Sequence, residues 1–272
     1  LPSLESPSSV GGPTRTPSAC ENTEALLTDA QLMAKTLIKP TIKARPPAKT
    51  VTVAFIHPGT VSAYFATSMM AMLLHDQHGP RHITGLLNEW SSANVSASRN
   101  TLAATFLDEK TSDWLLFIDA DMAWQHDALD QLLATADPAK APVVGGLCFG
   151  ASQDRLWPTI YQIAQADGRL KTVRADTYER DAMIQVAATG AAFLLIHRSV
   201  LEEIRRRKYN AAFPFFQESE MDGEPVGEDL TFCLRAGNAG FSVWVNTGVK
   251  VGHHKSHLLT EELFDSQAKD DQ

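Results

Sequence analysis

The stretch Trp-Leu-Leu-Phe-Ile-Asp-Ala-Asp, residues 114–121, constrains the fold of this chain more than any other part of it. A short continuous run of apolar residues is typical of a strand that is buried on both faces of a sheet. Asp119 and Asp121 follow this run directly, and burying a charge without a partner costs considerable free energy. The stretch therefore predicts a buried strand whose carboxyl end carries a site for a positively charged group.

Strands and helices alternate through the first half of the chain. Each predicted strand is followed by a segment whose apolar residues have helical spacing. Alternation of this kind indicates βαβ units and a largely parallel sheet. Ser96 or Ser98 is expected to cap the third helical segment. The predicted strands are 51–56, 81–88, 114–119 and 141–149, and the predicted helices are 61–76, 96–110 and 126–136.

The second half of the chain predicts a more mixed arrangement. The expected elements are a hairpin over 158–173 with its turn at Asp167-Gly168, a strand, glycine break, strand and helix over 183–207, an acidic loop over 218–229, a helix, and two separate strands over 241–246 and 249–254. Together with the first half, this pattern predicts an α/β fold with one central sheet.

Composition divides the chain into three parts. Residues 1–50 are rich in Pro and Ser and predict a tail and linker with one short helix over 21–38. Residues 51–258 form the predicted folded domain, and residues 259–272 form an acidic C-terminal tail. The 44% hydrophobic content of the 272 residues suits a single sizeable core.

Charge and cysteine usage argue against several classes of protein. The net charge of −8 argues against coating nucleic acid. No apolar stretch approaches the roughly 20 residues that a membrane-spanning helix needs, and the N-terminal residues lack the apolar core of a signal peptide. Cys20, Cys148 and Cys233 form no CxxC pair. Their number and spacing predict a reducing compartment, the cytoplasm.

The two aspartates after the buried strand are candidate metal ligands. Ligands of open α/β sheets gather outside the carboxyl ends of the strands, where Asp119 and Asp121 are expected. Mg²⁺ and Mn²⁺ prefer oxygen ligands and often bind through one or two carboxylates together with substrate phosphates. The alternative is a helix cap followed by a surface charge.

Two further groups of polar residues point to chemistry. Glu228 and Asp229 begin a predicted helix, where the macrodipole alone would explain them, and where a carboxylate can also act as a general base. His253 and His254 stand at the end of the last predicted strand, and imidazole suits Mn²⁺ better than Mg²⁺. Zinc is the rival metal, although no HExxH supports it, and a structural or exposed role is the other alternative for each histidine.

Residues 98–122, 188–204 and 227–254 resemble GT-A glycosyltransferases, nucleotide-sugar-dependent enzymes with a Rossmann-like fold. The resemblance extends over about residues 51–258 and lies nearest to the family-2-like and mannan-polymerase-like transferases. It implies a mixed, mostly parallel central sheet flanked by helices. It also implies that Asp119 and Asp121 bind the metal and the ribose and diphosphate of the donor, with His253 or the adjacent His254 as a further metal ligand.

The resemblance assigns the remaining site residues to the donor and the acceptor. Asp229 corresponds to the catalytic base of inverting members, with Glu228 beside it in the acceptor pocket. On the donor side, Arg99 organises the site, and His57 and Pro58 belong to the loop that holds the nucleotide base. Gly190 lines the acceptor side.

These assignments imply a metal-dependent transferase that moves a sugar, a hexose, from a nucleoside-diphosphate sugar to a hydroxyl of a glycan, protein or other acceptor. Mn²⁺ or Mg²⁺ is the expected cofactor, and inversion or retention at the anomeric carbon is left open. The QxxRW element of processive family-2 synthases is absent, which argues against polysaccharide synthesis at a membrane. One alternative is a GT-A-like nucleotide-sugar or glycan-binding module without turnover. A haloacid-dehalogenase-type phosphatase is disfavoured because Ala123 stands where those enzymes carry Thr.

Three other segments have two interpretations each. The aromatic residues Trp157, Phe213, Phe215 and Phe216 either wall an acceptor pocket or belong to the core, which is favoured. The basic run 205–208 either contacts a polyanion or ends a helix, which is favoured. The acidic loop 218–229 is hypothesised to be a lid over the donor.

Overall fold

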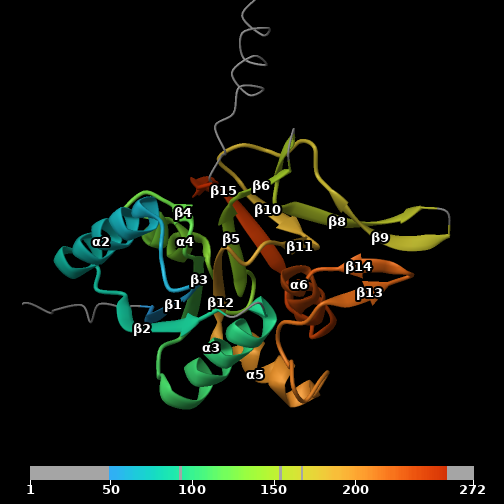
Figure 1. Cartoon of the computed structure of the whole chain (residues 1–272), viewed down its shortest axis with the longest axis horizontal. Helices are drawn as coiled ribbons and strands as arrows, with labels where there is room; N and C mark the ends of the chain where they lie inside the picture. Colours follow the sequence, from blue (N-terminus) through green and yellow to red (C-terminus); the bar gives the residue numbers. More distant parts are fainter. Residues whose placement is uncertain (1–48, 92–93, 153–154, 167, 256–272) are drawn as a thin grey trace, which may run out of the picture. The chain divides into compact units, whose positions relative to one another are not determined.

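The computed structural model describes residues 49–91, 94–152, 155–166 and 168–255, and a seven-stranded sheet forms its centre (Figure 1). The predicted helix over 21–38, almost all of the N-terminal tail and the whole C-terminal tail lie outside the described residues. The elements are β1 (Val51–His57), α2 (Ala63–His78), β2 (Ile83–Trp90), α3 (Val95–Glu109), β3 (Trp114–Asp119), β4 (Met122–Ala123), α4 (Ala128–Thr135), β5 (Val143–Leu147), β6 (Phe149–Ser152), β7 (Arg155–Pro158), β8 (Ile160–Ala166), β9 (Arg169–Arg174), β10 (Met183–Val186), β11 (Ala188–Thr189), β12 (Phe193–His197), α5 (Arg198–Arg207), β13 (Ser219–Met221), β14 (Glu224–Val226), α6 (Glu228–Asn238), β15 (Val243–Lys250) and β16 (Gly252–His253).

The central sheet has the strand order β10-β15-β5-β12-β3-β1-β2. Strands β2, β1, β3, β5 and β15 run in one direction, and β12 and β10 run against them. The predicted mixed, mostly parallel sheet is therefore confirmed. Its carboxyl edge carries His57, Asp119 and Leu147, the last residues of β1, β3 and β5.

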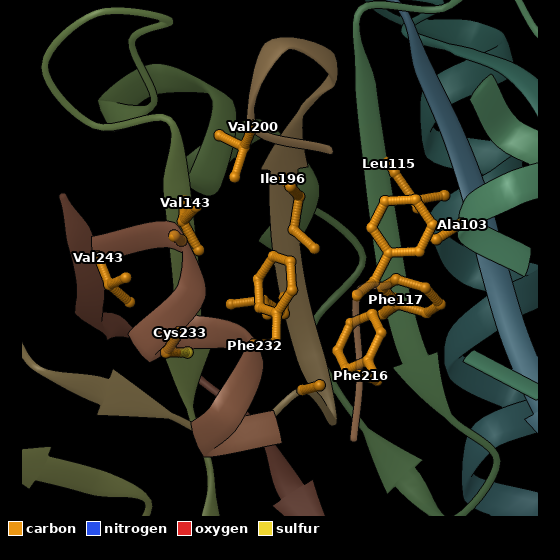
Figure 2. Packing of buried hydrophobic residues seen from close by; sticks show 14 of the residues in the cluster. Ala103, Leu115, Phe117, Val143, Ile196, Val200, Phe216, Phe232, Cys233 and Val243 are labelled. Carbon is orange, nitrogen blue, oxygen red and sulfur yellow. The ribbon is translucent and has the colours of Figure 1, made fainter. Parts of the chain in front are cut away.

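Helices cover both faces of the sheet, and alternate residues of β3 belong to different cores. Leu115 and Phe117 pack on one face against α3, α5 and α6, as Figure 2 shows for Phe117, Phe216 and Phe232. Trp114, Leu116 and Ile118 pack on the other face against α2 and α4. All five side chains are at most 1% exposed, which explains the uninterrupted apolar run before Asp119.

The helices begin where capping groups are available. Ser62 caps α2 by accepting a hydrogen bond from the Phe65 N–H. Asn94 caps α3 by accepting from the Ala97 N–H at 3.0 Å, so the prediction of Ser96 or Ser98 as the cap is wrong. The amide oxygen of Asn94 precedes the first helical residue, whereas both serines already lie inside the helix. None of the helices in the described residues is long and apolar enough to cross a membrane.

Two predictions about the second half of the chain are wrong. The acidic loop over 218–229 contains the hairpin β13–β14, whose turn residues Asp222 and Gly223 both have positive φ. An Asp-Gly pair suits such a two-residue turn. The lid role of this segment stays a hypothesis.

The two strands expected over 241–246 and 249–254 are largely one strand, β15. It continues through an irregularity between Asn246 and Lys250, where Asn246 Oδ1 accepts from the Gly248 N–H at 3.0 Å. The hairpin over 158–173 is confirmed as β8–β9, and the basic run 205–208 is confirmed as the end of α5.

Candidate functional site

Arg99 of α3 joins the carboxyl end of β3 to the start of α6. Its side chain is 5% exposed, and Nη2 donates to Asp119 Oδ1 at 2.8 Å and to Oδ2 at 3.1 Å. Nη1 donates to Glu228 Oε1. One buried guanidinium therefore neutralises two carboxylates that come from distant parts of the sequence.

Three carboxylates near Arg99 stabilise its positive charge. Burial alone would lower the pKa of the Arg99 guanidinium, but Asp119, Glu228 and Asp229 together raise it above its ordinary value. A buried pair of this kind depends on both partners, because removing one leaves an uncompensated charge. Arg99 thus holds Asp119 and Glu228 in fixed positions at one site.

Asp121 and His253 meet beside this cluster. His253 lies on β16, which pairs with β4, and its Nε2 lies 3.0 Å from Asp121 Oδ2. Its Nδ1 lies 2.9 Å from the carbonyl oxygen of Phe149, which only accepts, so Nδ1 carries a hydrogen. Neutral His253 then presents a lone pair to a carboxylate, and such a pair of acceptors requires a proton or a metal ion between them.

This donor set fits a divalent cation that also binds a phosphate. Among the described residues there is no group of three or more His, Cys, Asp or Glu side chains arranged to hold a metal. Asp121 and His253 alone provide two ligands, and Mg²⁺ or Mn²⁺ commonly completes its shell with substrate phosphates and water. Asp119 is engaged by Arg99, and its role as a metal ligand stays a prediction.

His254 lies differently from His253. Its backbone N–H donates to the Asp121 carbonyl oxygen at 2.8 Å, and its ring lies 5.2 Å from the ring of Tyr64. Of the two predicted histidines, the structure brings the His253 side chain to Asp121. Lys255, which the sequence analysis missed, places Nζ 3.3 Å from Asp121 Oδ2. No local pattern marks Lys255, because its partner Asp121 lies far away in the sequence.

Asp229 occupies the first turn of α6. Its Oδ1 accepts from the Leu230 N–H at 2.8 Å. Burial, followed by the negative charge of Glu228, raises the pKa of the Asp229 carboxyl to about 6, although Arg99 opposes the shift. A carboxylate with a pKa near 6 accepts a proton more readily than an ordinary aspartate does, so the position suits a general base.

Gly190 lies against Asp229, between β11 and β12. A methyl group on Gly190 would lie 3.4 Å from Asp229 Oδ2 and 3.6 Å from Thr159 Cβ. Glycine thus leaves room for about one methyl group beside Asp229 Oδ2. The structure therefore brings Gly190 and Asp229 together, and the role of Gly190 on the acceptor side stays a prediction.

His57 and Pro58 lie at the end of β1. His57 Nδ1 accepts from the Gly59 N–H at 3.1 Å, and Nε2 lies 3.3 Å from Asn88 Oδ1. These bonds fix the turn that follows β1 and place Pro58 in the wall of a cavity. His57 thus supports the loop, and Pro58 contacts the cavity.

Asp119 and Asp229 line two different cavities. The Asp119 cavity, of about 580 Å³, is lined by residues that include Pro58, Val95, Asp119, Asp121 and Lys255. The Asp229 cavity, of about 660 Å³, lies between the β8–β9 hairpin and the start of α6 and is described below. The Arg99 bridge joins Asp119, which lines the first cavity, to Glu228, the sequence neighbour of Asp229.

The aromatic residues divide between core and periphery. Phe215 and Phe216 are fully buried, which confirms their predicted place in the core, and Trp157 and Phe213 are partly buried. Asn100, which the sequence analysis missed, holds the segment: Oδ1 accepts from the Phe215 N–H at 2.9 Å, and Nδ2 donates to the Phe216 carbonyl. Phe216 in turn lies under the Arg99 guanidinium, 5.8 Å from ring centroid to Cζ.

The helix-flanked, mixed sheet with these site residues at its carboxyl edge is a GT-A fold. The chain belongs to the glycosyltransferase-like family 2, whose sequence profile matches residues 35–266. A comparison with curated proteins gave no match.

Three solved structures illustrate the likeness. A197 from STIV has 17% sequence identity and a TM-score of 0.51, over 76% of this chain and 86% of that chain. GalNAc-T7 with UDP, GalNAc and Mn²⁺ has 11% identity and a TM-score of 0.46, over 77% and 44%. The inositol-1-phosphate CTP transferase from T. maritima has 11% identity and a TM-score of 0.41, over 82% and 96%. At these identities the likeness to A197 supports the fold alone.

Proposed function

We propose that this chain is a metal-dependent, inverting glycosyltransferase that moves a hexose from a nucleoside-diphosphate sugar to a hydroxyl acceptor. The Arg99 bridge carries the proposal, because it holds the strand end with Asp119 and the helix start with Glu228 and Asp229 at one site. Membership of the glycosyltransferase-like family 2 supports the sugar-transfer chemistry.

The donor would bind in the Asp119 cavity. Asp121 and His253 would hold Mn²⁺ or Mg²⁺, which would neutralise the charge on the leaving nucleoside diphosphate. Pro58 and Val95 line the cavity where the nucleotide would lie. Asp119, held by Arg99, would accept hydrogen bonds from ribose hydroxyls, and Lys255, which pairs with Asp121, would add a positive charge near the diphosphate.

The acceptor would approach Asp229 from the Asp229 cavity. Asp229 Oδ2 takes the proton of the acceptor hydroxyl as its oxygen forms a bond to the anomeric carbon. The bond from that carbon to the diphosphate oxygen breaks with its electron pair, and the nucleoside diphosphate leaves. Attack on the side opposite the leaving group inverts the configuration. Arg99 holds Glu228 beside Asp229 in the first turn of α6. The negative charge of Glu228 raises the pKa of the Asp229 carboxyl.

Two assays test the proposal together. Incubation with UDP-, GDP-, CDP- and dTDP-sugars and Mn²⁺ should release one nucleoside diphosphate, slowly with water and faster with a suitable acceptor. Proton NMR of the glycoside formed should show inverted anomeric configuration. Metal-dependent binding of a nucleotide sugar with neither hydrolysis nor transfer would favour the alternative, a nucleotide-sugar-binding module.

The compartment is part of the same proposal. Cys148 and Cys233 are both buried and free, and Cys233 is fully enclosed among core residues. Unpaired buried thiols suit a reducing compartment, so we place the protein in the cytoplasm. Labelling of the endogenous protein with a thiol reagent under denaturing conditions, without prior reduction, should modify both cysteines.

A further inference from the structure

We propose that the acceptor carries an anionic group, a carboxylate or phosphate on a sugar, and that the β8–β9 hairpin binds this group. The inference rests on the proposed function, because Asp229 forms part of the same cavity. The cavity is lined by Arg155, Tyr161, Lys171, Thr172, Val173, Arg174, Asp176, Pro225, Gly227, Asp229 and Leu230. Figure 1 shows the β8–β9 and β13–β14 hairpins extending from the same side of the domain as α6.

The wall opposite Asp229 is basic in a chain that is otherwise acidic. Strand β9 carries Arg169, Lys171 and Arg174 within six residues, whereas the whole chain has a net charge of −8. Arg155, Lys171 and Arg174 all line the cavity. A local cluster of this sign attracts anions and excludes cations.

Arg155 and Lys171 form ion pairs with carboxylates, and Arg174 is left to bind an anionic ligand. Arg155 Nη2 pairs with Asp176 at 2.9 Å, and Lys171 Nζ pairs with Glu224 at 3.3 Å. The first pair is well exposed and the second is partly exposed, so both contribute little and can exchange for a ligand. Within the described part of the chain, Arg174 has no carboxylate partner.

Arg174 is nevertheless held in place. Its guanidinium carbon lies 3.9 Å from the ring centroid of Trp157, which is a close cation–π contact. A guanidinium that lies on an aromatic ring keeps its N–H groups in one plane, and this arrangement matches the two oxygens of a carboxylate or phosphate. Trp157 thus fixes the donor group that an anion would need.

Tyr161 adds a second polar contact. It lies opposite Arg174 in the β8–β9 register, and its hydroxyl makes no hydrogen bond to any other described residue. A hydroxyl open to the cavity can bind either the anion or a sugar hydroxyl. An acceptor sugar would therefore be held at two points, with its anionic group at Arg174 and its reacting hydroxyl at Asp229.

Binding of matched glycosides to the full chain tests this inference without requiring turnover. The probes are p-nitrophenyl β-D-glucuronide, the corresponding glucoside and the glucoside 6-phosphate, each titrated by saturation-transfer NMR. The glucuronide differs from the glucoside only at C6, where a carboxylate replaces the hydroxymethyl group. We expect one anionic probe or both to bind at least about tenfold more tightly than the glucoside, and the stronger of the two identifies the group as carboxylate or phosphate.

Variants locate the effect. Arg174→Ala should abolish the preference for the anionic probe and leave binding of the glucoside unchanged. Arg169→Ala removes an exposed arginine of the same strand that does not line the cavity, and it should keep the preference. The inference is overturned if the wild type binds neither anionic probe more tightly than the glucoside, or if the preference survives in Arg174→Ala. Nucleotide-sugar binding and turnover are measured separately, so failure of the proposed function would be seen in those assays and not in this one.

Discussion

Arg99 and Asp119 are joined by two hydrogen bonds from one nitrogen, at 2.8 and 3.1 Å, and the other terminal nitrogen of Arg99 binds Glu228. The bridge links the strand end that would bind the donor to the helix that carries the proposed base. Because the guanidinium is almost completely buried, it gains from both carboxylates with little screening by water. The relative positions of Asp119 in the proposed donor site and Glu228 beside the proposed base therefore depend on the Arg99 side chain.

Replacing this side chain should destabilise the fold strongly. Arg99→Ala leaves Asp119 and Glu228 without their common partner, and we expect a loss of about 3–5 kcal/mol in the free energy of unfolding. Urea denaturation followed by circular dichroism measures it. Lys250→Ala is the control, because Lys250 forms an exposed pair with Asp181 and should cost less than about 1 kcal/mol. Equal losses in the two variants would contradict the account.

The raised pKa of Asp229 should make stability depend on pH. Between its ordinary value of 3.8 and about 6, the folded chain holds a proton on Asp229 that the unfolded chain has released. Stability from this group therefore falls as the pH rises through that window. Asp229→Asn should remove the dependence and be more stable than the wild type at pH 7 by about 1–3 kcal/mol, with the difference vanishing near pH 4. Denaturation curves at pH 4, 5, 6 and 7 measure this, and a constant difference across the range would refute it.

Activity should follow the same group. The wild-type kcat/KM should fall as the pH drops below about 6, because the base becomes protonated. Asp229→Asn should lower kcat by about 10²–10⁴-fold and leave the Kd of the nucleotide sugar nearly unchanged. Steady-state kinetics and calorimetric titration of the donor separate these effects. A large rise in the donor Kd would instead assign Asp229 to the donor site.

Gly190 offers a steric test of the approach to Asp229. Gly190→Ala adds a methyl group 3.4 Å from Asp229 Oδ2, which is an ordinary contact distance but which would crowd the carboxylate proposed to meet the acceptor. We expect kcat/KM for the acceptor to fall by about 10–100-fold with donor binding unchanged. Gly237→Ala is the matched control, since its methyl group meets nothing within 4 Å, and it should stabilise α6 by about 0.5–1 kcal/mol without loss of activity. Unchanged acceptor kinetics in Gly190→Ala would show that the acceptor approaches from elsewhere.

The sequence predicted most of the central sheet because its inner strands, such as β1, β3 and β5, are buried on both faces. The strand over 114–119 has the same bounds in the structure, and the alternating helices fall within a few residues of their predicted ranges. Asp119 and Asp121 lie at the carboxyl edge as expected. Local apolar patterns were sufficient to predict these strands, because a short continuous apolar run indicates a strand that is buried on both faces, as in parallel sheets.

The features that were not predicted from the sequence depend mainly on tertiary contacts. The Asn246–Gly248 stretch has the composition of a turn, but Thr247 Oγ1 donates to the Glu179 carbonyl at 2.7 Å and keeps β15 continuous. The segment over 218–229 was interpreted from its acidity, although its Asp222-Gly223 pair signals a hairpin. The roles of Asn100 and Lys255 depend on partners far away in sequence, which no local pattern identifies.

Nucleotide binding to the wild type and to Asp121→Asn tests the central claim most directly. The melting temperature of each is measured with UDP, GDP, CDP and dTDP, with and without Mn²⁺, and Asp108→Asn serves as a control at an exposed pair with Arg205. The account predicts that one nucleotide raises the melting temperature of the wild type and of Asp108→Asn only when Mn²⁺ is present, and that Asp121→Asn shows no rise. A rise without Mn²⁺, a rise that persists in Asp121→Asn, or no rise with any nucleotide would contradict it.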